Sequence, residues 1–206
     1  MNLYKYIGKR LFDISLSLTF LIILSIPFIV IFCLNVKKFG LKPFFIQKRT
    51  GKNLKSFYII KFKTLNDIFD SNGKILIDEL RFSTWGNFLR KYSLDEIPQL
   101  FNVIKGEMAI VGPRPLLPEY DSKYPQKYLR RFEVRPGLTG LAQTNGRNEI
   151  SWDYRLQCDV DYVNNMSLWY DIQIMIKTFF QLINGKGNVK SMSMIEYFNE
   201  LPEPNH

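Results

Sequence analysis

Two adjacent carboxylates, Asp95 and Glu96, follow the basic residues Arg90 and Lys91. Side by side, such carboxylates can bind a hard divalent cation through oxygen, or divide into a nucleophile and a metal ligand. Ser93 with Glu96 three residues later matches a capping box, so we predict that the pair opens a helix, where negative charge is favoured. The simpler interpretation of the same residues is helix capping without catalysis.

Arginine on rigid turns is the second feature that could do chemistry. Arg114 lies between Pro113 and Pro115, which restrict its backbone. A planar guanidinium on such a turn suits bidentate phosphate binding better than a flexible surface position does. Two further arginines have similar settings: Arg135 before Pro136-Gly137, and Arg147 after Asn145-Gly146. Each of them could instead be a surface arginine in a turn.

Other charged residues carry weaker signals. Lys61 and Lys63 alternate on a predicted strand, and Asp159 and Asp161 precede the last predicted helix, where exposure or capping is the default interpretation. Taken together, carboxylates, guanidiniums and an oxygen-liganded Mg²⁺ beside a membrane are what phosphoryl transfer from an anionic soluble donor to a lipid would require.

Residue counts exclude several other chemistries. The two cysteines have no zinc or redox spacing, and the single histidine is His206. Cys/His metal sites, histidine acid–base catalysis and a disulfide framework are therefore ruled out. The 206 residues suit one domain or two at most, and 46% hydrophobic residues with 23% charged residues exclude intrinsic disorder.

The formal net charge of +9 is concentrated in the first third of the chain. Residues 1–65 hold twelve Lys/Arg and a single acid, Asp13, whereas residues 66–206 hold 16 basic and 18 acidic residues. The basic part surrounds a run of 23 residues without any charge, between Asp13 and Lys37. We interpret this pattern as an apolar membrane segment whose basic flanks both lie at the membrane surface. A nucleic-acid-binding protein is disfavoured because the remaining chain offers little charge to neutralise phosphates.

As a helix, the uncharged run would reach about 34 Å, enough for a hydrocarbon core of about 30 Å. It exceeds the apolar region of a signal peptide, and no A-x-A-like cleavage site follows it. Both flanks are basic, although a spanning helix should have one depleted flank. Pro27 lies near the middle, and Ser25 can bond to carbonyls that proline frees. Two predictions stay open: a kinked spanning helix, and a helix broken at Pro27 that enters and leaves on the cytoplasmic side.

The rest of the chain predicts short strands followed mostly by helices. Aromatic and β-branched runs at 44–47 and 57–62 flank a turn at 50–53 and predict a strand pair, and 67–78 predicts a loop. We expect helices over 85–92, over 98–105 and over 167–183, the last packed in the core or lying at the membrane interface. The tail from 184 onward is polar.

The motifs around these charged residues resemble those of a known family. The strings KYSLDEIPQLFNVIKGEM from Lys91 and VGPRP from Val111, then RPGLTG from Arg135, are similar to those of the bacterial sugar transferases, the monotopic phosphoglycosyl transferases. QKRTG from Gln47 and KFKT from Lys61 match the motifs that precede these in the family, and KRLFD from Lys9 with the apolar run matches the membrane anchor. The resemblance covers residues 5–183, and the small size is similar to that of the minimal members.

The resemblance implies a fold and a place in the cell. We expect an α+β protein with an N-terminal re-entrant (helix-break-helix) membrane helix over residues 1–36. A mostly helical cytosolic catalytic domain with short β elements and interfacial amphipathic helices would cover 37–184, and a polar C-terminal tail 185–206. The enzyme would lie in the bacterial inner membrane with its active site on the cytoplasmic face. Its oligomeric state stays open between a monomer and a homodimer.

The resemblance also implies a reaction. Asp95 would attack the β-phosphate of a UDP-sugar, release UMP and carry a phosphosugar, which undecaprenyl phosphate would then accept. Glu96 would assist, and both carboxylates would hold Mg²⁺. Binding or positioning of substrate is expected from Lys61, Arg90, Arg114, Arg135, Pro136, Gly137, Thr139, Arg147 and Asp159.

Two details refine this expectation. Asn145 to Asn148 followed by Ser151-Trp152 most resembles the subgroup that transfers N,N′-diacetylbacillosamine phosphate in protein N-glycosylation, so we expect this sugar or another acetamido sugar. The pathway stays open among glycoprotein, O-antigen and capsule assembly. The family commonly has Ser directly before the break-inducing Pro, whereas Ile26 here separates Ser25 from Pro27. The bend could survive with different hydrogen bonding.

Two other functions remain open on the residues alone. A membrane-bound Mg²⁺-dependent phosphohydrolase could use the same carboxylates to activate water. A non-catalytic membrane scaffold could recruit the enzymes of a glycan pathway.

Overall fold

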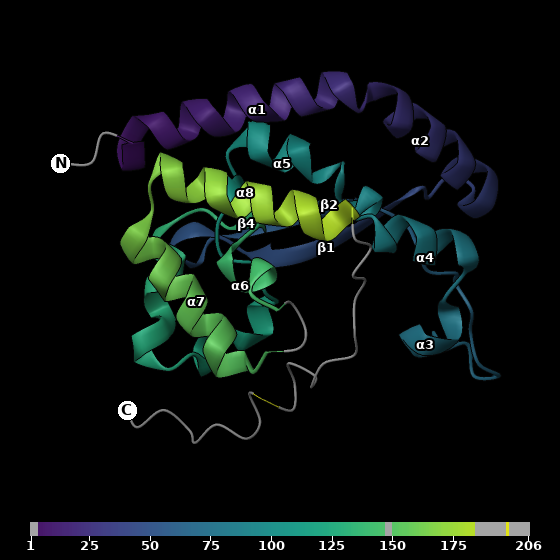
Figure 1. Ribbon diagram of the computed structural model, residues 1–206. Coiled ribbons are helices and arrows are strands. Elements are labelled where there is room, and N and C mark those ends of the chain that lie inside the picture. Colours follow the sequence, from purple (N-terminus) through teal and green to yellow (C-terminus); the bar gives the residue numbers. More distant parts are fainter. Residues whose placement is uncertain (1–3, 147–149, 184–196, 198–206) are drawn as a thin grey trace.

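The computed structural model describes residues 4–146, 150–183 and 197. It shows an α+β protein in which helices dominate, as predicted (Figure 1). The strands form two small sheets: β1 (Phe44–Thr50) pairs antiparallel with β2 (Ser56–Phe62), and β3 (Ala109–Val111) pairs parallel with β4 (Gly137–Thr139). A bent pair of helices covers the top of the molecule, and the strands and the remaining helices lie beneath it.

The N-terminal apolar run folds as two helices, α1 (Lys9–Ile23) and α2 (Ser25–Phe39), after a π-helical turn at Tyr4–Gly8. The helices meet at 65°, and no single helix among the described residues is long and apolar enough to cross a membrane. The break lies at Leu24 and not at Pro27, where we predicted it. Pro27 belongs to the first turn of α2, where the N–H that proline lacks is not needed. Ser25 Oγ donates to the carbonyl of Ile22 at 2.7 Å, so the bend survives the inserted Ile26.

The beginning of α1 is fastened to the rest of the protein. Arg10 donates to the carbonyls of Val103 and Ile104 at 2.5 and 2.6 Å, at the C-terminal end of α5 (Gln99–Lys105). These are carbonyls that a helix leaves without an intrahelical partner. Asp13 accepts a hydrogen bond from the backbone N–H of Ile110 on β3 at 3.1 Å. Both contacts bring charged side chains of α1 against elements that follow the carboxylate motif.

The C-terminal end of α2 is also fastened to the rest of the protein. Asn35 is fully buried; its Nδ2 donates to the carbonyls of Pro43 and Lys63, both at 3.0 Å. Its Oδ1 accepts from Trp85 Nε1 at 2.8 Å. Between these two ends, Phe28 packs against Phe62 with ring centroids 5.1 Å apart. The inner face of the bent pair is therefore part of the core.

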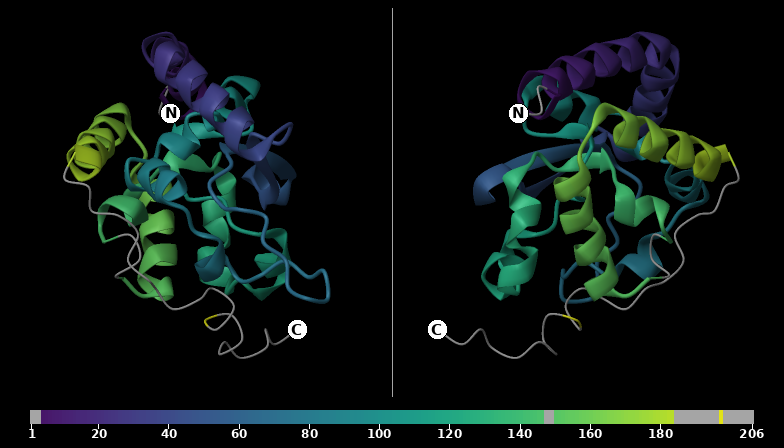
Figure 2. Two further views of the ribbon diagram at one scale, coloured as in Figure 1. Left: turned by 90° about the vertical axis from the view of Figure 1, so that its right-hand side faces the viewer. Right: turned by 60° about the vertical axis from the view of Figure 1, so that its left-hand side comes forward.

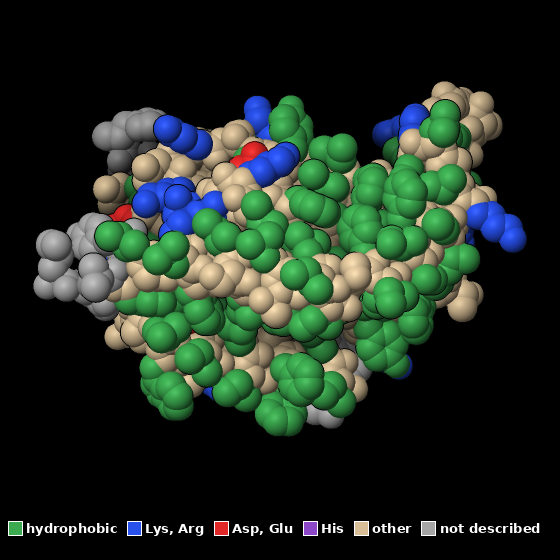
Figure 3. Space-filling model, turned by 90° about the horizontal axis from the view of Figure 1, so that it is seen from above, with side chains coloured by type: hydrophobic (Ala, Val, Ile, Leu, Met, Phe, Trp, Pro, Cys, Tyr) green, Lys and Arg blue, Asp and Glu red, His purple; other side chains and the backbone are tan. Residues whose placement is uncertain are grey.

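The outer face of the bent pair is apolar and exposed. Seen from above, hydrophobic side chains follow both helices, and lysines and arginines gather near the edges (Figure 3). The exposed side chains are Leu11, Leu18, Ile22, Ile23, Ile26, Ile29, Val30, Phe32, Leu34 and Val36. An apolar surface of this extent marks an interaction with a membrane or with another protein.

The hairpin of β1 and β2 extends further than predicted. Its register pairs Phe45 with Lys61 and Arg49 with Phe57, and its turn is a short 3₁₀ helix, Lys52–Leu54. The segment after β2 is mostly irregular, with one bridge between Phe69 and Ile75, followed by α3 (Asp78–Arg81). The helix α4 (Thr84–Lys91) begins where Ser83 accepts from the N–H of Gly86, as expected for an N-cap.

The predicted capping box at Ser93 is wrong. Asp95 and Glu96 lie in a 3₁₀ turn, Leu94–Glu96, and Ser93 makes no side-chain cap. Ser93 instead adopts a left-handed conformation with φ of 53°. Such a conformation is unfavourable for a residue with a side chain and is tolerated at functional sites when the surroundings require it. The turn leads through Pro98 into α5, which was predicted.

Helices of the second half stand below and beside the parallel strand pair (Figures 1 and 2). Two 3₁₀ segments, Pro118–Lys123 and Gln126–Glu133, precede β4, and α6 (Leu141–Thr144) follows it. The helix α7 (Trp152–Asn165) was not predicted, and it contains Asp159 and Asp161, which therefore do not precede the last helix as caps. The last described helix, α8 (Leu168–Ile183), confirms the prediction.

Candidate active site

The carboxylates of Asp95 and Glu96 meet three of the predicted cations. Lys61 Nζ donates to Glu96 Oε1 at 2.5 Å, and Arg114 donates to the same oxygen at 3.3 Å. Lys61 comes from β2 and Arg114 from the turn after β3, so side chains of two separate segments meet one oxygen atom of a third. Arg90 belongs to the same group because its charge acts on Asp95. Its Nε donates to Thr64 Oγ1 at 2.9 Å, which orients the guanidinium.

The two carboxylates have opposite electrostatic settings. Asp95 is 8% exposed, and its burial, followed by the nearby charge of Glu96, raises its pKa to about 6. Burial also acts to raise the pKa of Glu96, but the charges and hydrogen bonds of Lys61 and Arg114 outweigh it and hold that pKa at about 2. The surrounding cations therefore favour the ionised form of Glu96, whereas burial and the charge of Glu96 disfavour the ionised form of Asp95.

Asp95 also has fewer side-chain hydrogen bonds than Glu96. Within the described part of the chain, no side-chain hydrogen bond reaches its carboxylate. A carboxylate whose oxygens no side-chain hydrogen bond occupies can approach a substrate phosphorus, so Asp95 is the better suited of the two to act as a nucleophile. When the pKa values of two neighbouring carboxylates differ, the two groups usually have different roles in catalysis.

Arg49 is a cation near this group that the sequence analysis did not single out. Its NH2 donates to Gln47 Oε1 at 2.6 Å, whereas its buried Nε has no hydrogen-bond partner among the described residues. Burial, followed by the charge of Arg114, lowers the pKa of Arg49 to about 10. The signal that could have found it is its place in the QKRTG motif, directly before the turn that joins β1 to β2.

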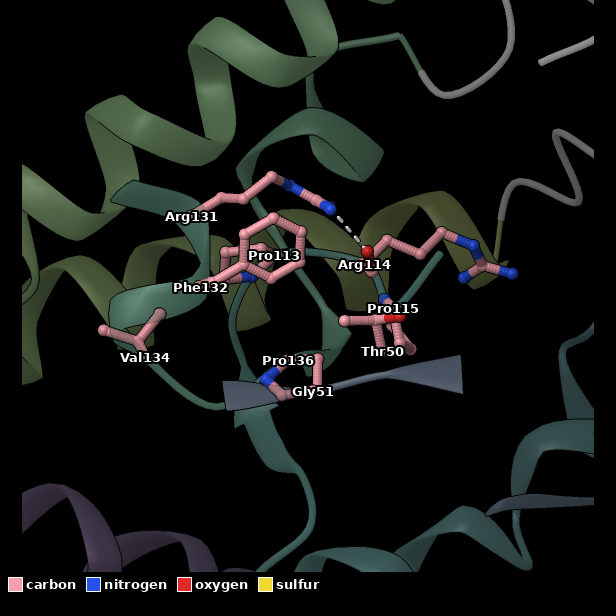
Figure 4. Close-up of a pocket in the computed structure, with 9 residues that line it drawn as sticks. All are labelled: Thr50, Gly51, Pro113, Arg114, Pro115, Arg131, Phe132, Val134 and Pro136. Atoms are coloured by element: carbon pink, nitrogen blue, oxygen red, sulfur yellow. Dashed lines mark hydrogen bonds between the residues drawn. The ribbon is translucent and has the colours of Figure 1, made fainter. Parts of the chain in front are cut away.

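A small hollow that is open to solvent lies beside Arg114 (Figure 4). Its walls include Thr50, Pro113, Pro115, Phe132 and Pro136, and they come from β1, from the turn after β3 and from the segment before β4. The side chain of Arg114 points out of this hollow, while its backbone carbonyl points toward Arg131 (Figure 4). The hollow thus lies behind the turn that carries Arg114 and does not contain the carboxylate pair.

Comparison with known proteins decides the family. The profile of the bacterial sugar transferases matches residues 4–185 of this chain. The chain belongs to the bacterial sugar transferase family. The expectation from the DE pair, the arginine turns and the N-terminal apolar run is therefore confirmed at the level of the family.

Two relatives of similar size support the assignment. This sugar transferase is 44% identical over 181 residues to an uncharacterized sugar transferase, EpsL, of Bacillus subtilis, covering 87% of this chain and 89% of that protein. It is 39% identical over 203 residues to the exopolysaccharide production protein ExoY of Sinorhizobium fredii, covering 88% of each. A larger relative is the UDP-glucose:undecaprenyl-phosphate glucose-1-phosphate transferase of Xanthomonas campestris, 36% identical over 89% of this chain but only 40% of that protein.

The other predicted site residues of this sugar transferase lie away from the carboxylate pair. Arg135 Nε donates to the carbonyl of Gly106 at 2.7 Å, at the same end of α5 that Arg10 contacts. Asp159 forms a buried ion pair with Arg131, at 2.9 Å. Thr139 Oγ1 lies 2.6 Å from Thr178 Oγ1 on α8.

The remaining predicted residues have structural or undescribed positions. Pro136 lines the hollow of Figure 4. Gly137 lies on β4, where a Cβ atom would stand 2.1 Å from the backbone nitrogen of Gly112, so only glycine permits the close approach of β3 and β4. Arg147 lies outside the described residues.

Proposed function

We propose that this sugar transferase moves a sugar-1-phosphate from a UDP-sugar to undecaprenyl phosphate through a covalent intermediate on Asp95. The observation that carries the proposal is the asymmetry of the carboxylate pair. Glu96 is hydrogen-bonded to Lys61 and Arg114, while the carboxylate of buried Asp95 accepts no side-chain hydrogen bond from the described residues. The names of relatives support the substrate classes. One acts on UDP-glucose and undecaprenyl phosphate, and the one from Salmonella typhimurium is an undecaprenyl-phosphate galactose phosphotransferase.

The bonds that form and break are those of two successive displacements. A carboxylate oxygen of Asp95 attacks the β-phosphorus of the UDP-sugar, and the bond between this phosphorus and the bridging oxygen breaks, so that UMP leaves with the electron pair. A phosphate oxygen of undecaprenyl phosphate then attacks the same phosphorus and restores the Asp95 carboxylate. Splitting one transfer into two steps is the logic of aspartyl-phosphate catalysis.

The neighbouring cations offset the charge that the phosphates bring. Lys61, Arg90 and Arg114 already lie around the carboxylates, and Arg114 extends out of its turn toward Glu96. Arg49, with its partnerless Nε, is a further donor for the leaving phosphate. Fixed charges of this kind stabilise a phosphoryl-transfer transition state because they need no reorganisation during the reaction.

The resemblance implies Mg²⁺, and the donor set agrees with a loosely held ion. No group of three or more His, Cys, Asp or Glu side chains among the described residues could hold a metal. Mg²⁺ commonly uses only one or two carboxylates and takes its other ligands from substrate phosphates and water. Asp95 and Glu96 would supply these carboxylates to an ion that arrives with the diphosphate. When bound, it would offset negative charge on the phosphates.

The membrane topology we propose is re-entrant, with both ends of the bent pair on the cytoplasmic side of the bacterial inner membrane. The support is that Arg10 and Asp13 at one end, and Asn35 at the other, contact the same cytosolic body. The exposed apolar outer face of the pair would enter the lipid, and exposed apolar side chains on α8, among them Trp169 and Phe179, would lie at its surface.

For the donor sugar we propose an acetamido sugar, with N,N′-diacetylbacillosamine first, on the resemblance of the segment around Asn145 and Trp152. The relatives named above act, by their names, on glucose and galactose, which are therefore the competing donors. The product would enter glycoconjugate assembly as its first lipid-linked sugar.

The test uses the full chain in lipid nanodiscs with a panel of UDP-sugars, with and without undecaprenyl phosphate. We expect UMP release, ping-pong kinetics and, without acceptor, a phosphosugar adduct on Asp95 detected by mass spectrometry. Asp95→Asn should abolish both signals, while the exposed Asp67→Asn serves as a matched control.

Other outcomes would favour the competing functions. Release of inorganic phosphate in place of UMP would indicate a phosphohydrolase. No turnover with any donor, together with an Asp95→Asn variant that keeps the glycan pathway active in cells, would indicate a scaffold.

A further inference from the structure

Arg131 and Asp159 form the most enclosed ion pair near the turn that carries Arg114. Arg131 Nε and NH2 donate to Asp159 Oδ2 at 3.1 and 2.9 Å, and the two side chains are 2% and 5% exposed. The rings of Tyr124 and Phe132 lie against the guanidinium, 5.3 and 5.1 Å from its carbon. Arg131 NH1 also donates to the hydroxyl of Tyr124 at 3.1 Å. The guanidinium is therefore held in a single orientation.

One contact of this guanidinium leads toward the active site. Arg131 NH2 donates to the backbone carbonyl of Arg114 at 2.7 Å, as the dashed line in Figure 4 shows. The prolines on either side of Arg114 lack an N–H and restrict the backbone, so the position of this carbonyl determines where the turn points. From the same residue, the side chain leaves the hollow and reaches Glu96 Oε1 at 3.3 Å.

Stability alone does not explain such a pair. Removing two charges from water costs free energy, and a well-packed apolar pair of similar volume is often as stable or more so. An apolar pair, however, could not donate to the carbonyl of Arg114. The buried charges therefore have a role that packing cannot replace.

We propose that Arg131 and Asp159 are positioning residues for the transfer reaction, which hold the Arg114 turn so that the Arg114 side chain meets Glu96 and the substrate phosphates. The proposal rests on the proposed function, because in that function Arg114 offsets the negative charge of the substrate phosphates. It also gives Asp159, predicted as a substrate-binding residue, a place in the site without contact to substrate.

The decisive variant is the double substitution Arg131→Met with Asp159→Leu, compared with Asp159→Asn alone. The single change leaves a buried guanidinium without its carboxylate and should lower both thermal stability and activity. The double change should recover thermal stability but leave kcat at least about tenfold below wild type, since small misplacements near reacting groups can cost about a hundredfold. Arg130→Met, an exposed neighbour paired with Glu133, is the matched control and should behave as wild type.

A second measurement separates positioning from general structure. In an Arg114→Met background, adding Arg131→Met and Asp159→Leu should lower kcat by less than about twofold, because residues that act through one another are not additive. Full activity of the double variant, or an unchanged loss in the Arg114→Met background, would overturn the proposal. Absence of UMP release by the wild-type protein would instead refute the proposed function, so the two failures are distinguishable.

Discussion

Lys9 Nζ, at the start of α1, lies 2.9 Å from Asp171 Oδ2 on α8, which joins the first and last described α-helices of the protein. The same nitrogen lies 2.8 Å from Asp13 Oδ1, and both carboxylates are almost fully buried. Tyr162 donates to the other oxygen of Asp171 at 2.7 Å. A single lysine thus compensates two buried carboxylates, one on α1 and one on α8.

Replacing this lysine should destabilise the whole protein. Lys9→Met would leave Asp13 and Asp171 without their shared cation, and breaking a buried pair in this way costs about 3–5 kcal/mol. We expect a thermal unfolding midpoint several degrees lower in detergent micelles, measured by intrinsic fluorescence. Lys38→Met, an exposed lysine of α2, is the control, and an equal shift in both variants would contradict a special role of Lys9.

The pH dependence of the reaction should report the ionisation of Asp95. Its pKa is raised to about 6, and only the ionised form can attack phosphorus, so kcat/KM should rise with pH through about 6 and then level off. Glu96, with a pKa of about 2, stays ionised throughout this range. Lys61→Met removes a cation that lowers the pKa of Asp95 and should move the rise to higher pH. A profile that is flat from pH 5 to 8 would contradict the assignment.

The same carboxylate should reduce stability at neutral pH. The folded pKa of Asp95 lies above the unfolded value of about 3.9, so ionising it costs the folded state free energy as pH rises through 6. Asp95→Asn removes this cost and should raise stability by about 1–3 kcal/mol at pH 7.5, with a smaller gain at pH 4. Unfolding midpoints at the two pH values measure the difference. A larger gain in stability at pH 4 than at pH 7.5 would contradict a raised pKa of Asp95.

A glycine in α4 should be essential for the orientation of Arg90. A Cβ atom on Gly86 would stand 1.9 Å from the carbonyl oxygen of Thr64, whose hydroxyl accepts from Arg90. Gly86→Ala must therefore displace Thr64 and with it the guanidinium. We expect at least about a tenfold loss of kcat, from a misplacement of the kind that costs up to about a hundredfold. The exposed Asn87→Ala on the next position of the helix should keep wild-type kinetics.

The topology of the bent pair can be tested by labelling. Exposed Cys33 is first replaced by serine, since buried Cys158 should not react. Cysteines at Ile7 and at Lys42, before and after the two helices, should then both be protected from a membrane-impermeant maleimide in intact spheroplasts and both react in inverted vesicles. Reaction from opposite sides would establish a spanning arrangement.

Several residues that the structure groups around the carboxylate pair could be singled out from the sequence, because they lie in local patterns that restrict them. Arg114 between two prolines and the adjacent acids drew attention without any knowledge of the fold. Lys61 was a weaker signal, since one face of a strand carries exposed lysines by default. That Lys61 and Arg114 share one oxygen of Glu96 depends on long-range packing and could not be read from any single motif.

The parts that were not predictable have identifiable causes. The strands β3 and β4 are three residues each, too short for an alternating pattern, and their pairing depends on glycines. The break was expected at Pro27, but a proline is tolerated in the first turn of a helix and clashes with the carbonyl four residues earlier, here that of Ile23, so the bend lies at Leu24. Asp159 could be noticed in the sequence, whereas its partner Arg131 could not, because a buried ion pair between distant segments has no local signature.

The contact between Lys9 and Asp171 has a consequence for how the protein is made. A ribosome completes α1 and α2 long before it reaches α8, so for most of translation Lys9 lacks one of the two carboxylates that it finally compensates. Asn35, by contrast, finds Lys63 and Trp85 soon after α2 has emerged. The helix α2 can therefore dock early. The helix α1, which Arg10 and Asp13 join to α5 and β3, gains the contact between Lys9 and Asp171 only when α8 has been made. The packing of the first helix of this protein is thus completed only together with the last described helix.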